Sequence, residues 1–312
     1  MLSNHSNSAL TVDKLNKTFK NIKAVSEISF SIQPGDIFAF LGPNGAGKTT
    51  TLRILLDIIR ADSGKITWNL NGKKDRLPDA SQIGYLPEER GLYTDLPVIR
   101  SLIYLASIRG MDAHDARRSA IEWLDRLELA DRAKEKLQTL SKGNQQKIQF
   151  VASILHKPAF AILDEPFSGL DPLNQEKFIG YIKDLQQQGT TILLSSHQMH
   201  LVEKIAGKVF FINKGKELMS GALHEIYEKF GINQSIEIRF HGDIPHEKID
   251  NLTGLSEFQP FDGGLVKISF KSGYALNKIL AEISTLDGIQ AINTTKADLH
   301  EIFINLVNDQ IP

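Results

Sequence analysis

The spacing of hydrophobic and polar positions predicts an α/β protein. Residues 28–32 alternate strictly between apolar and polar side chains, as a half-buried antiparallel strand does. Residues 37–41, 160–163 and 190–194 are short apolar or β-branched runs, which predict buried strands. Residues 175–187, between the last two runs, have a helical pattern. Because a helix between buried strands is typical of a parallel sheet, we expect a parallel core with an antiparallel β subdomain.

Two further patterns divide the chain into parts. Apolar residues recur at helical spacing between residues 98 and 137, so we expect a helical subdomain at about 96–140. After Gly231 the pattern reads strand, helix, two strands, helix and strand, which is the β-α-β-β-α-β order of a small ferredoxin-like α+β domain. The predicted parts are a disordered start at 1–9, a large domain at 10–231 and a C-terminal accessory domain at 232–312.

Composition narrows the possible functions. The 312 residues carry a net charge of −1, and residues 233–312 hold 6 Lys/Arg against 11 Asp/Glu, so we expect no nucleic acid partner. The absence of cysteine excludes disulfides, thiolate metal sites and a cysteine nucleophile. No apolar run approaches the ~18 residues that a membrane-spanning helix needs. Any membrane role is therefore expected to come through a partner chain.

The strongest chemical motif follows the predicted strand at 37–41. It reads G-x-x-x-x-G-K-T, the phosphate-binding loop pattern, and a helical stretch comes after it. Its glycines let successive N–H groups point at one spot, and the helix adds the positive end of its dipole. We expect the Lys48 ammonium to bind the outer phosphates and the Thr49 hydroxyl to bind Mg²⁺. The motif consists of Gly42, Pro43, Asn44, Gly45, Ala46, Gly47, Lys48 and Thr49, with Thr50 adjoining it.

Two other strand ends carry polar side chains. Asp164 and Glu165 follow the run at 160–163, and His197 comes after the run at 190–194 and two serines. Ligands bind at the carboxyl ends of the strands in open α/β sheets, so we expect these side chains beside the phosphate loop. Asp164 is expected to hold Mg²⁺, and Glu165 to orient or deprotonate an attacking water.

In this order the motifs resemble those of the ATP-binding subunit of an ABC transporter, whose cassette would span residues 10–230. The resemblance implies a P-loop NTPase fold, with ATP and Mg²⁺ bound and ATP hydrolysed to ADP and phosphate. Glu88–Tyr93 and the C-terminal domain look similar to the sodium-efflux and drug-export branch. The matching segments are the phosphate loop, Leu140–Gln146 as the signature, Phe160–Glu165 as Walker B, Ser168–Asp171 as the D-loop and His197 as the switch histidine.

The same resemblance assigns roles that residue types alone leave open. It implies that Ser141 and Gly143 grip the ATP of a second subunit, and that Asp171 makes a contact across the dimer. It also implies that His197 senses the γ-phosphate and that Phe19 stacks on adenine. From the residues alone, Ser141 could be a helix cap, Asp171 an Asx turn, His197 structural and Phe19 part of the core.

Three positions depart from the family's usual pattern. Lys142 stands in place of a glycine, and Asn144 in place of a glutamine. Glu88 stands where the family usually has glutamine, which touches Mg²⁺ and the attacking water. A glutamate keeps an oxygen for Mg²⁺ and adds a negative charge, so we expect Glu88 to be a metal ligand. An ordinary solvated charge is the alternative.

The resemblance also implies partners. We expect a second ATP-binding subunit, either the same chain or a close paralogue, to bind head to tail. Separate polytopic membrane subunits would bind near residues 88–103 and hold the protein at the cytoplasmic face of a membrane. The branch implies export of an ion or an amphipathic drug. The rival interpretation is a soluble ABC ATPase without transport, and the C-terminal domain is expected to sense a ligand or to support the dimer.

Overall fold

The computed structural model describes residues 8–70, 72–75, 77–89, 91–229, 235–270, 274–295 and 298–308. The chain divides into two compact units, Met1–Gly221 and Ala222–Pro312, and each unit is described by itself.

Ser8 and Ala9, the last two residues of the expected disordered start, pack against the first sheet. Both are buried, and the Ala9 amide donates to the carbonyl oxygen of Ile32 at 2.8 Å. This bond extends strand pairing by one residue beyond Leu10. A serine before the first strand gives no hydrophobic signal, so the sequence alone does not predict the extension. The rest of that segment, residues 1–7, lies outside the described residues.

The first unit contains an antiparallel sheet of four strands in the order β2-β1-β4-β5. Its strands β1 and β2 are longer than their alternating patterns predict, because the register shifts between Val12 and Leu15 and interrupts the alternation. Lys14 and Glu27 have positive φ of 45° and 52° in these two strands. The strands are β1 (Leu10–Phe19), β2 (Ile22–Ile32), β4 (Ser63–Leu70) and β5 (Lys73–Asp75).

The second sheet of this unit has six strands in the order β10-β9-β3-β8-β7-β6. All of them except the edge strand β10 pair in parallel, which confirms the expected parallel core. Their carboxyl ends therefore meet at the same end of the sheet. The strands are β3 (Ile37–Leu41), β6 (Ile83–Leu86), β7 (Phe160–Asp164), β8 (Thr191–Ser196), β9 (Lys208–Asn213) and β10 (Lys216–Ala222).

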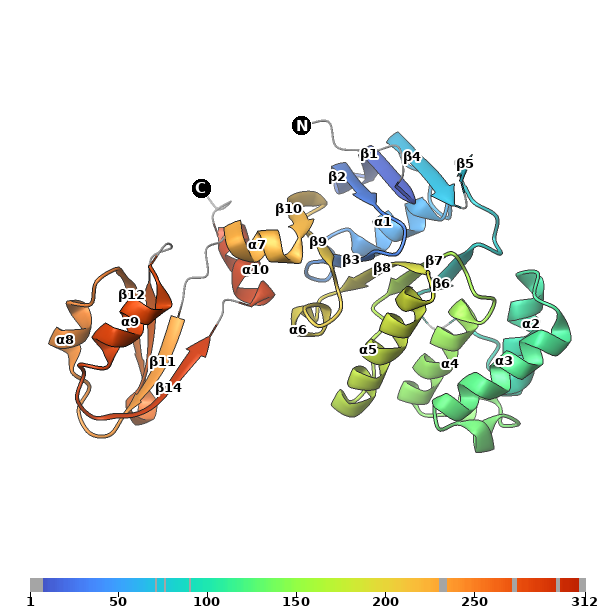
Figure 1. Cartoon of the computed structure of the whole chain (residues 1–312). Helices are drawn as coiled ribbons and strands as arrows, with labels where there is room; N and C mark the ends of the chain where they lie inside the picture. Colours follow the sequence, from blue (N-terminus) through green and yellow to red (C-terminus); the bar gives the residue numbers. More distant parts are fainter. Residues whose placement is uncertain are drawn as a thin grey trace. The chain divides into compact units, whose positions relative to one another are not determined.

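Helices fill the space between the sheets and cover the outer face of the second sheet (Figure 1). Helix α1 (Lys48–Leu55) lies between the two sheets and packs into a core that includes Phe40 and Phe210, whose rings are 4.9 Å apart. The outer helices are α4 (Lys142–Ile154) and α5 (Pro172–Gln187), with α2 (Val98–Ile108) and α3 (Ala113–Arg126) beside α4 and a short α6 (Met199–Val202) after β8.

The second unit contains an antiparallel sheet in the order β12-β13-β11-β14. One face packs against α8 and α9 in an apolar core that includes Ile238, Ile249 and Ile283. Helix α10 is joined to β13 by an ion pair between Lys267 and Glu301 at 2.6 Å. The elements are α7 (Leu223–Lys229), β11 (Ser235–Phe240), α8 (His246–Asp250), β12 (Leu255–Phe261), β13 (Leu265–Phe270), α9 (Leu276–Ile283), β14 (Ile289–Thr295) and α10 (Leu299–Asn308).

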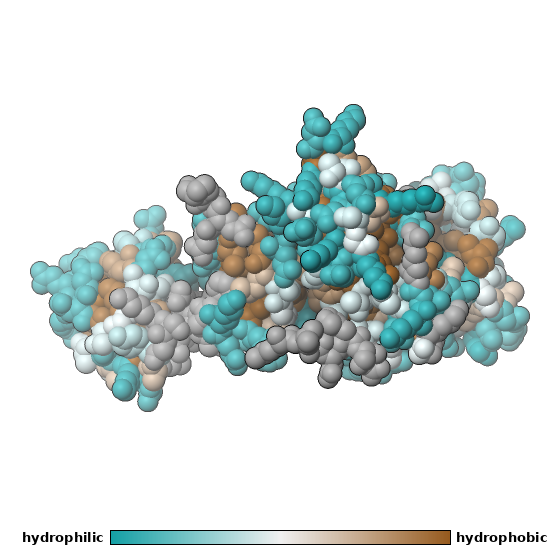
Figure 2. All heavy atoms as spheres, turned by 90° about the horizontal axis from the view of Figure 1, so that it is seen from above, coloured by the Kyte–Doolittle hydropathy of each residue, from teal (hydrophilic) through white to brown (hydrophobic). Residues whose placement is uncertain are grey.

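Hydrophilic residues predominate on the surface seen from above, with apolar residues in scattered patches (Figure 2). Exposed large apolar side chains of the first unit include Ile22, Tyr93 and Tyr104. Within the described ranges, no helix combines the length and the apolar character that crossing a membrane requires.

Candidate active site

Two glycines of the phosphate loop lie where backbone segments approach closely. A Cβ atom at Gly42 would clash with the carbonyl oxygen of Ile212, and one at Gly47 would clash with that of Ala24. Gly47 also has φ of 108°, which residues with side chains rarely adopt, and it caps α1. The loop therefore packs tightly on its neighbours and ends at the N-terminus of a helix, where the dipole favours an anion.

A cavity of about 330 Å³ lies over this loop. Its lining brings Glu88 and Glu165 together with the loop, as the sequence predicts. It also includes Ile22, Lys23 and Ala24 of β2, which sequence reasoning did not single out. One sequence feature could have indicated them: Ile22 directly follows a polar turn, and its side chain is 73% exposed. The other lining residues are Pro43, Asn44, Gly45, Ala46, Gly47, Lys48, Thr49 and Thr50.

The Lys48 side chain is buried and folded back on its own loop. Its Nζ donates to the carbonyl oxygen of Gly42 at 2.7 Å and to that of Pro43 at 3.3 Å. The same atom lies 3.4 Å from Oε1 of Glu165. A buried cation needs such partners, and phosphate oxygens entering the cavity are acceptors that can replace them.

Glu165 lies between two side chains that can carry positive charge. Its Oε1 faces Lys48, and its Oε2 lies 3.0 Å from Nδ1 of His197. The backbone amide of Glu165 donates to Oγ of Ser195 at 3.2 Å. Neither carboxylate oxygen receives a directed hydrogen bond from any residue in the described part of the chain. Both oxygens are therefore able to accept a hydrogen bond from water.

Asp164 is fully buried and accepts a hydrogen bond from Oγ of Ser195. Burial raises the pKa of Asp164, and the charges of Glu88 and Glu165 add to this, while hydrogen bonds from Ser195 and Thr49 oppose it. Its Oδ2 atom is buried and has no hydrogen-bond partner among the described residues.

The surroundings of Asp164 fit a magnesium ion. A buried carboxylate oxygen without a partner and a threonine hydroxyl are hard oxygen donors of the kind that Mg²⁺ prefers. The Thr49 hydroxyl and the charge of Glu88 both act on the pKa of Asp164, the hydroxyl lowering it and the charge raising it. No group of three or more His, Cys, Asp or Glu side chains that could hold a metal ion occurs in the described ranges.

Glu88 follows β6 in a segment that α4 holds in place. The side-chain Nε2 of Gln149 donates to the carbonyl oxygen of Pro87 at 2.8 Å and to that of Glu89 at 3.1 Å. Gln149 is buried, and its two bonds flank Glu88 on both sides. Sequence reasoning missed this residue, although a glutamine on an otherwise apolar stretch of helix is a usable signal.

Ser141 and Gly143 lie at the start of the same helix. Ser141 caps α4, because its Oγ accepts a hydrogen bond from the backbone N–H of Asn144 at 3.3 Å. Ser141 is therefore a helix cap whether or not it also binds a nucleotide. A Cβ atom at Gly143 would stand 3.1 Å from the carbonyl oxygen of Gly169 in the predicted D-loop. The signature and the D-loop of one chain are therefore in close contact.

Asp171 and Phe19 lie at the ends of other elements. Asp171 caps α5 and accepts a hydrogen bond from the backbone N–H of Asn174 at 2.9 Å. This bond and a second one from the Asn174 side chain lower the pKa of Asp171. Phe19 ends β1 with 43% of its side chain exposed, so it is not a core residue. The Lys17 ammonium lies 5.3 Å from the centre of the Phe19 ring. An exposed ring remains available for stacking.

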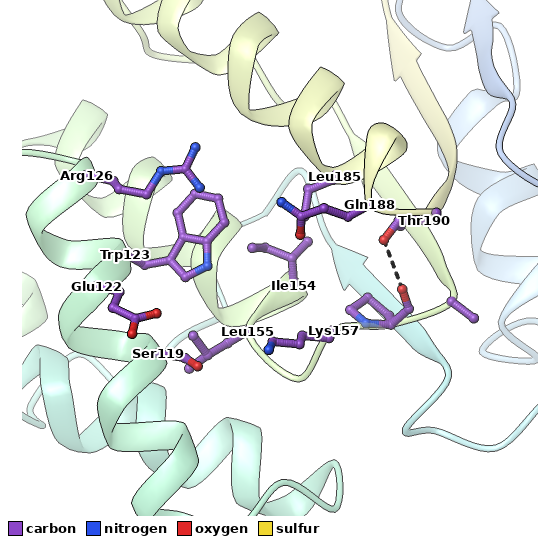
Figure 3. A pocket seen from close by; sticks show the side chains of 13 residues that line it. Ser119, Glu122, Trp123, Arg126, Ile154, Leu155, Lys157, Leu185, Gln188 and Thr190 are labelled. Atoms are coloured by element: carbon purple, nitrogen blue, oxygen red, sulfur yellow. Dashed lines mark hydrogen bonds between the residues drawn. The ribbon is translucent and has the colours of Figure 1, made fainter.

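A second pocket, of about 430 Å³, lies away from the phosphate loop, between α3, the ends of α4 and α5, and the starts of β7 and β8 (Figure 3). The Arg126 guanidinium lies over the rings of Trp123 and Tyr181, at 4.5 and 5.1 Å, and pairs with Asp184 at 2.6 Å. Because this pocket is at the amino ends of the strands, it is separate from the phosphate site.

Comparison with known proteins identifies the family. The ABC transporter family matches residues 25–168. An uncharacterized ABC transporter ATP-binding protein of Bacillus subtilis (strain 168), YhaQ, is 38% identical over 298 residues, which are 96% of this chain and 98% of that protein. This chain belongs to the ABC transporter ATP-binding proteins. Such proteins bind ATP, typically with Mg²⁺, hydrolyse it, and work as dimers with the membrane subunits of transporters.

Further comparisons place this ABC protein among named relatives and solved structures. The linearmycin resistance ATP-binding protein LnrL of Bacillus subtilis (strain 168) is 31% identical, over 75% of each chain. The structure of an ATP-binding subunit of an ABC transporter matches 72% of this chain and 93% of its own, with 27% identity and a TM-score of 0.65. A dimeric ATP-binding cassette bound to ADP and Pi matches with a TM-score of 0.63 at 22% identity, over 69% of this chain and 98% of its own. These likenesses confirm the predicted cassette fold.

Proposed function

We propose that this ABC protein hydrolyses ATP at the described cavity and thereby powers export through separate membrane subunits, at the cytoplasmic face of a membrane. The observation that carries the proposal is the buried Glu165 carboxylate, which lies between Lys48 and His197 beside the phosphate loop. A carboxylate in that position can act on a water that attacks a phosphate held by the loop.

In the proposed reaction, Lys48 turns from the carbonyl oxygens of its loop to the outer phosphates of ATP. Glu165 orients the attacking water and accepts its proton. The water oxygen bonds to the γ-phosphorus while the bond from the γ-phosphorus to the bridging oxygen breaks, and ADP leaves with that oxygen. His197 contacts the γ-phosphate. Bound Mg²⁺ supplies positive charge to the phosphate oxygens, and Thr49, Asp164 and Glu88 are the residues that would hold it. Phe19 stacks on the adenine ring.

We further propose that each ATP is shared by two subunits arranged head to tail. Ser141 and Gly143 of a second copy, or of a close paralogue, would complete the site over the phosphates, and Asp171 would lie in the interface. The N-terminus of α4 suits this role because its free amides and dipole favour a phosphate. The position of Gly143 against Gly169 supports it, since the signature then moves with the D-loop.

Export is the direction that the names of relatives support. They include a linearmycin resistance protein, a Nod factor export protein and a lipopolysaccharide export protein. We propose the sodium-efflux and drug-export branch as the nearest functional group. Tyr93 and Tyr104, whose exposed rings are 5.8 Å apart, mark the surface near residues 88–103 where we propose that the membrane subunits dock.

The proposed domain limits are a cassette at 10–231, with its helical subdomain at about 96–140, and an accessory domain at 232–312. The compact units divide ten residues earlier, after Gly221, so that α7 belongs to the second unit. A soluble ABC ATPase without transport is the second candidate. Purification of the tagged chain from its native membranes separates the two. A polytopic membrane protein that co-purifies and stimulates ATP hydrolysis supports transport, whereas tight, salt-sensitive binding of RNA or DNA would rule it out.

A further inference from the structure

The two outer strands of the C-terminal sheet differ in how their edges are protected. β12 carries Glu257 and Pro260, and its register with β13 shifts between Leu255 and Glu257. Charge, proline and irregular register are the devices by which proteins prevent unwanted strand pairing. The opposite outer strand, β14, reads Ile-Gln-Ala-Ile-Asn-Thr-Thr over Ile289–Thr295 and has no charge, no proline and no glycine. One edge is blocked and the other is open.

The open edge has unused bonding capacity. β14 is the last strand of its sheet and pairs with β11 on one side, as Figure 1 shows. In the described part of the chain, no backbone group of residues 290–295 makes a hydrogen bond beyond that ladder. A row of unpaired N–H and C=O groups is a template for another strand.

Ile292 shows that the apolar core is also incomplete at this edge. It lies opposite Ile238, and directly opposed residues of an antiparallel pair share one face of the sheet. Ile238 is fully buried on the face that α8 and α9 cover, whereas Ile292 remains 43% exposed. A strand added beside β14 would cover the Ile292 side chain.

We propose that β14 pairs with β14 of a second copy of this chain, antiparallel and about a two-fold axis, so that two four-stranded sheets become one. A second copy is the partner that the chemistry favours, because an uncharged strand opposes no like charges when it meets itself. A two-fold contact uses the same patch on both subunits and closes on itself. The pairing needs no nucleotide, so it goes beyond the proposed ATP-dependent contact and does not depend on it.

Cysteine scanning of the full chain without nucleotide tests the contact. The chain has no cysteine, so any disulfide-linked dimer reports the introduced residue alone. We expect mild oxidation to link Gln290→Cys, Ala291→Cys, Ile292→Cys or Asn293→Cys at one or two adjacent positions and not at the others. Only positions beside the two-fold axis bring two Cα atoms within the 4.4–6.8 Å of a disulfide. Gln259→Cys on β12 is the matched control and should stay monomeric.

A charge at the open edge provides the second measurement. Ile292→Lys should weaken nucleotide-free dimerisation at least tenfold in sedimentation, while Gln259→Lys should leave it unchanged. Both positions are exposed, and equal thermal unfolding of the two variants verifies folding. Equal cross-linking at β12 and β14, uniform cross-linking along β14, or a monomeric unmodified chain at high concentration would each overturn the proposal. ATP hydrolysis by Ile292→Lys at high protein concentration tests the proposed activity separately.

Discussion

The side-chain amide of Gln149 donates to the carbonyl oxygen of Pro87 at 2.8 Å, and it binds the carbonyl oxygen of Glu89 as well. Gln149 thereby fixes the backbone on both sides of Glu88. Because Gln149 belongs to α4, the helix whose first turn carries the signature is also the helix that positions a proposed metal ligand of the same chain's site. Movement at one end of α4 is therefore expected to reach Glu88.

Gln149→Leu should raise the Mg²⁺ concentration needed for half-maximal ATP hydrolysis several-fold. The substitution keeps the volume but leaves two carbonyl oxygens without their donor, which costs about 1–3 kcal/mol of unfolding free energy. A magnesium titration of the ATPase rate measures the effect. Gln187→Leu, on the exposed side of α5, is the control. It should change neither the magnesium dependence of hydrolysis nor the free energy of unfolding. An unchanged magnesium dependence in Gln149→Leu would show that the amide does not position Glu88.

Glu165→Gln should reduce ATP hydrolysis roughly 100-fold or more, because the amide cannot take the proton of the attacking water. ATP binding should persist, since Lys48 and the phosphate loop are intact. In the Ile292→Lys background, which removes the proposed C-terminal pairing, this variant should be monomeric alone and dimeric with Mg-ATP on a sizing column. A protein that stays monomeric with Mg-ATP would contradict the shared site.

Gly143→Ala should reduce ATP hydrolysis about tenfold with little change in unfolding free energy. The new Cβ atom would press on the carbonyl oxygen of Gly169 at 3.1 Å, while alanine gains about 0.5–1 kcal/mol over glycine in a helix. Gly180→Ala on α5 is a matched control, because its Cβ atom would meet open space. The control should gain stability and keep full activity. If the two variants hydrolyse ATP equally fast, the close approach of Gly143 to Gly169 does not matter for hydrolysis, and the prediction is wrong.

Asp164→Asn should stabilise the protein at pH 7 in the absence of Mg²⁺ and nucleotide, although ATP hydrolysis should be lost. Because burial raises the pKa of Asp164 in the folded state, the folded protein holds the proton more tightly than the unfolded chain. Unfolding free energy therefore falls as the pH rises from the unfolded pKa, about 3.9, through the raised folded value. Urea midpoints between pH 4 and pH 7 should fall less in Asp164→Asn than in the unmodified protein. A lower midpoint for Asp164→Asn at pH 7 would refute this.

Much of the core could be predicted from the sequence, because burial of a parallel strand leaves a direct mark in a continuous apolar run. The strands at Ile37–Leu41 and Phe160–Asp164 are examples. The full length of β1 could not be predicted, because its register shifts break the period of two. The location of the site could also be predicted, from the phosphate loop and from the polar residues at two strand ends.

What the sequence could not show depends on tertiary contacts. The apolar neighbours of Gln149 indicate that it is buried, but they do not show which groups it binds, because those partners lie 60 and 62 residues away in the chain. The approach of Gly143 to Gly169 is invisible for the same reason. Phe19 could be a core residue or an exposed ring by pattern alone, and only its place at the end of β1 decides that it is exposed.

The unequal edges of the C-terminal sheet also limit how far assembly can proceed. If β14 joins β14 of a second copy, the outermost strands of the combined sheet are two copies of β12, each carrying Glu257 and Pro260. Such a sheet has no open edge left with which a third chain could pair. Growth stops at two, so an unprotected strand can serve as a joint here without seeding a fibre.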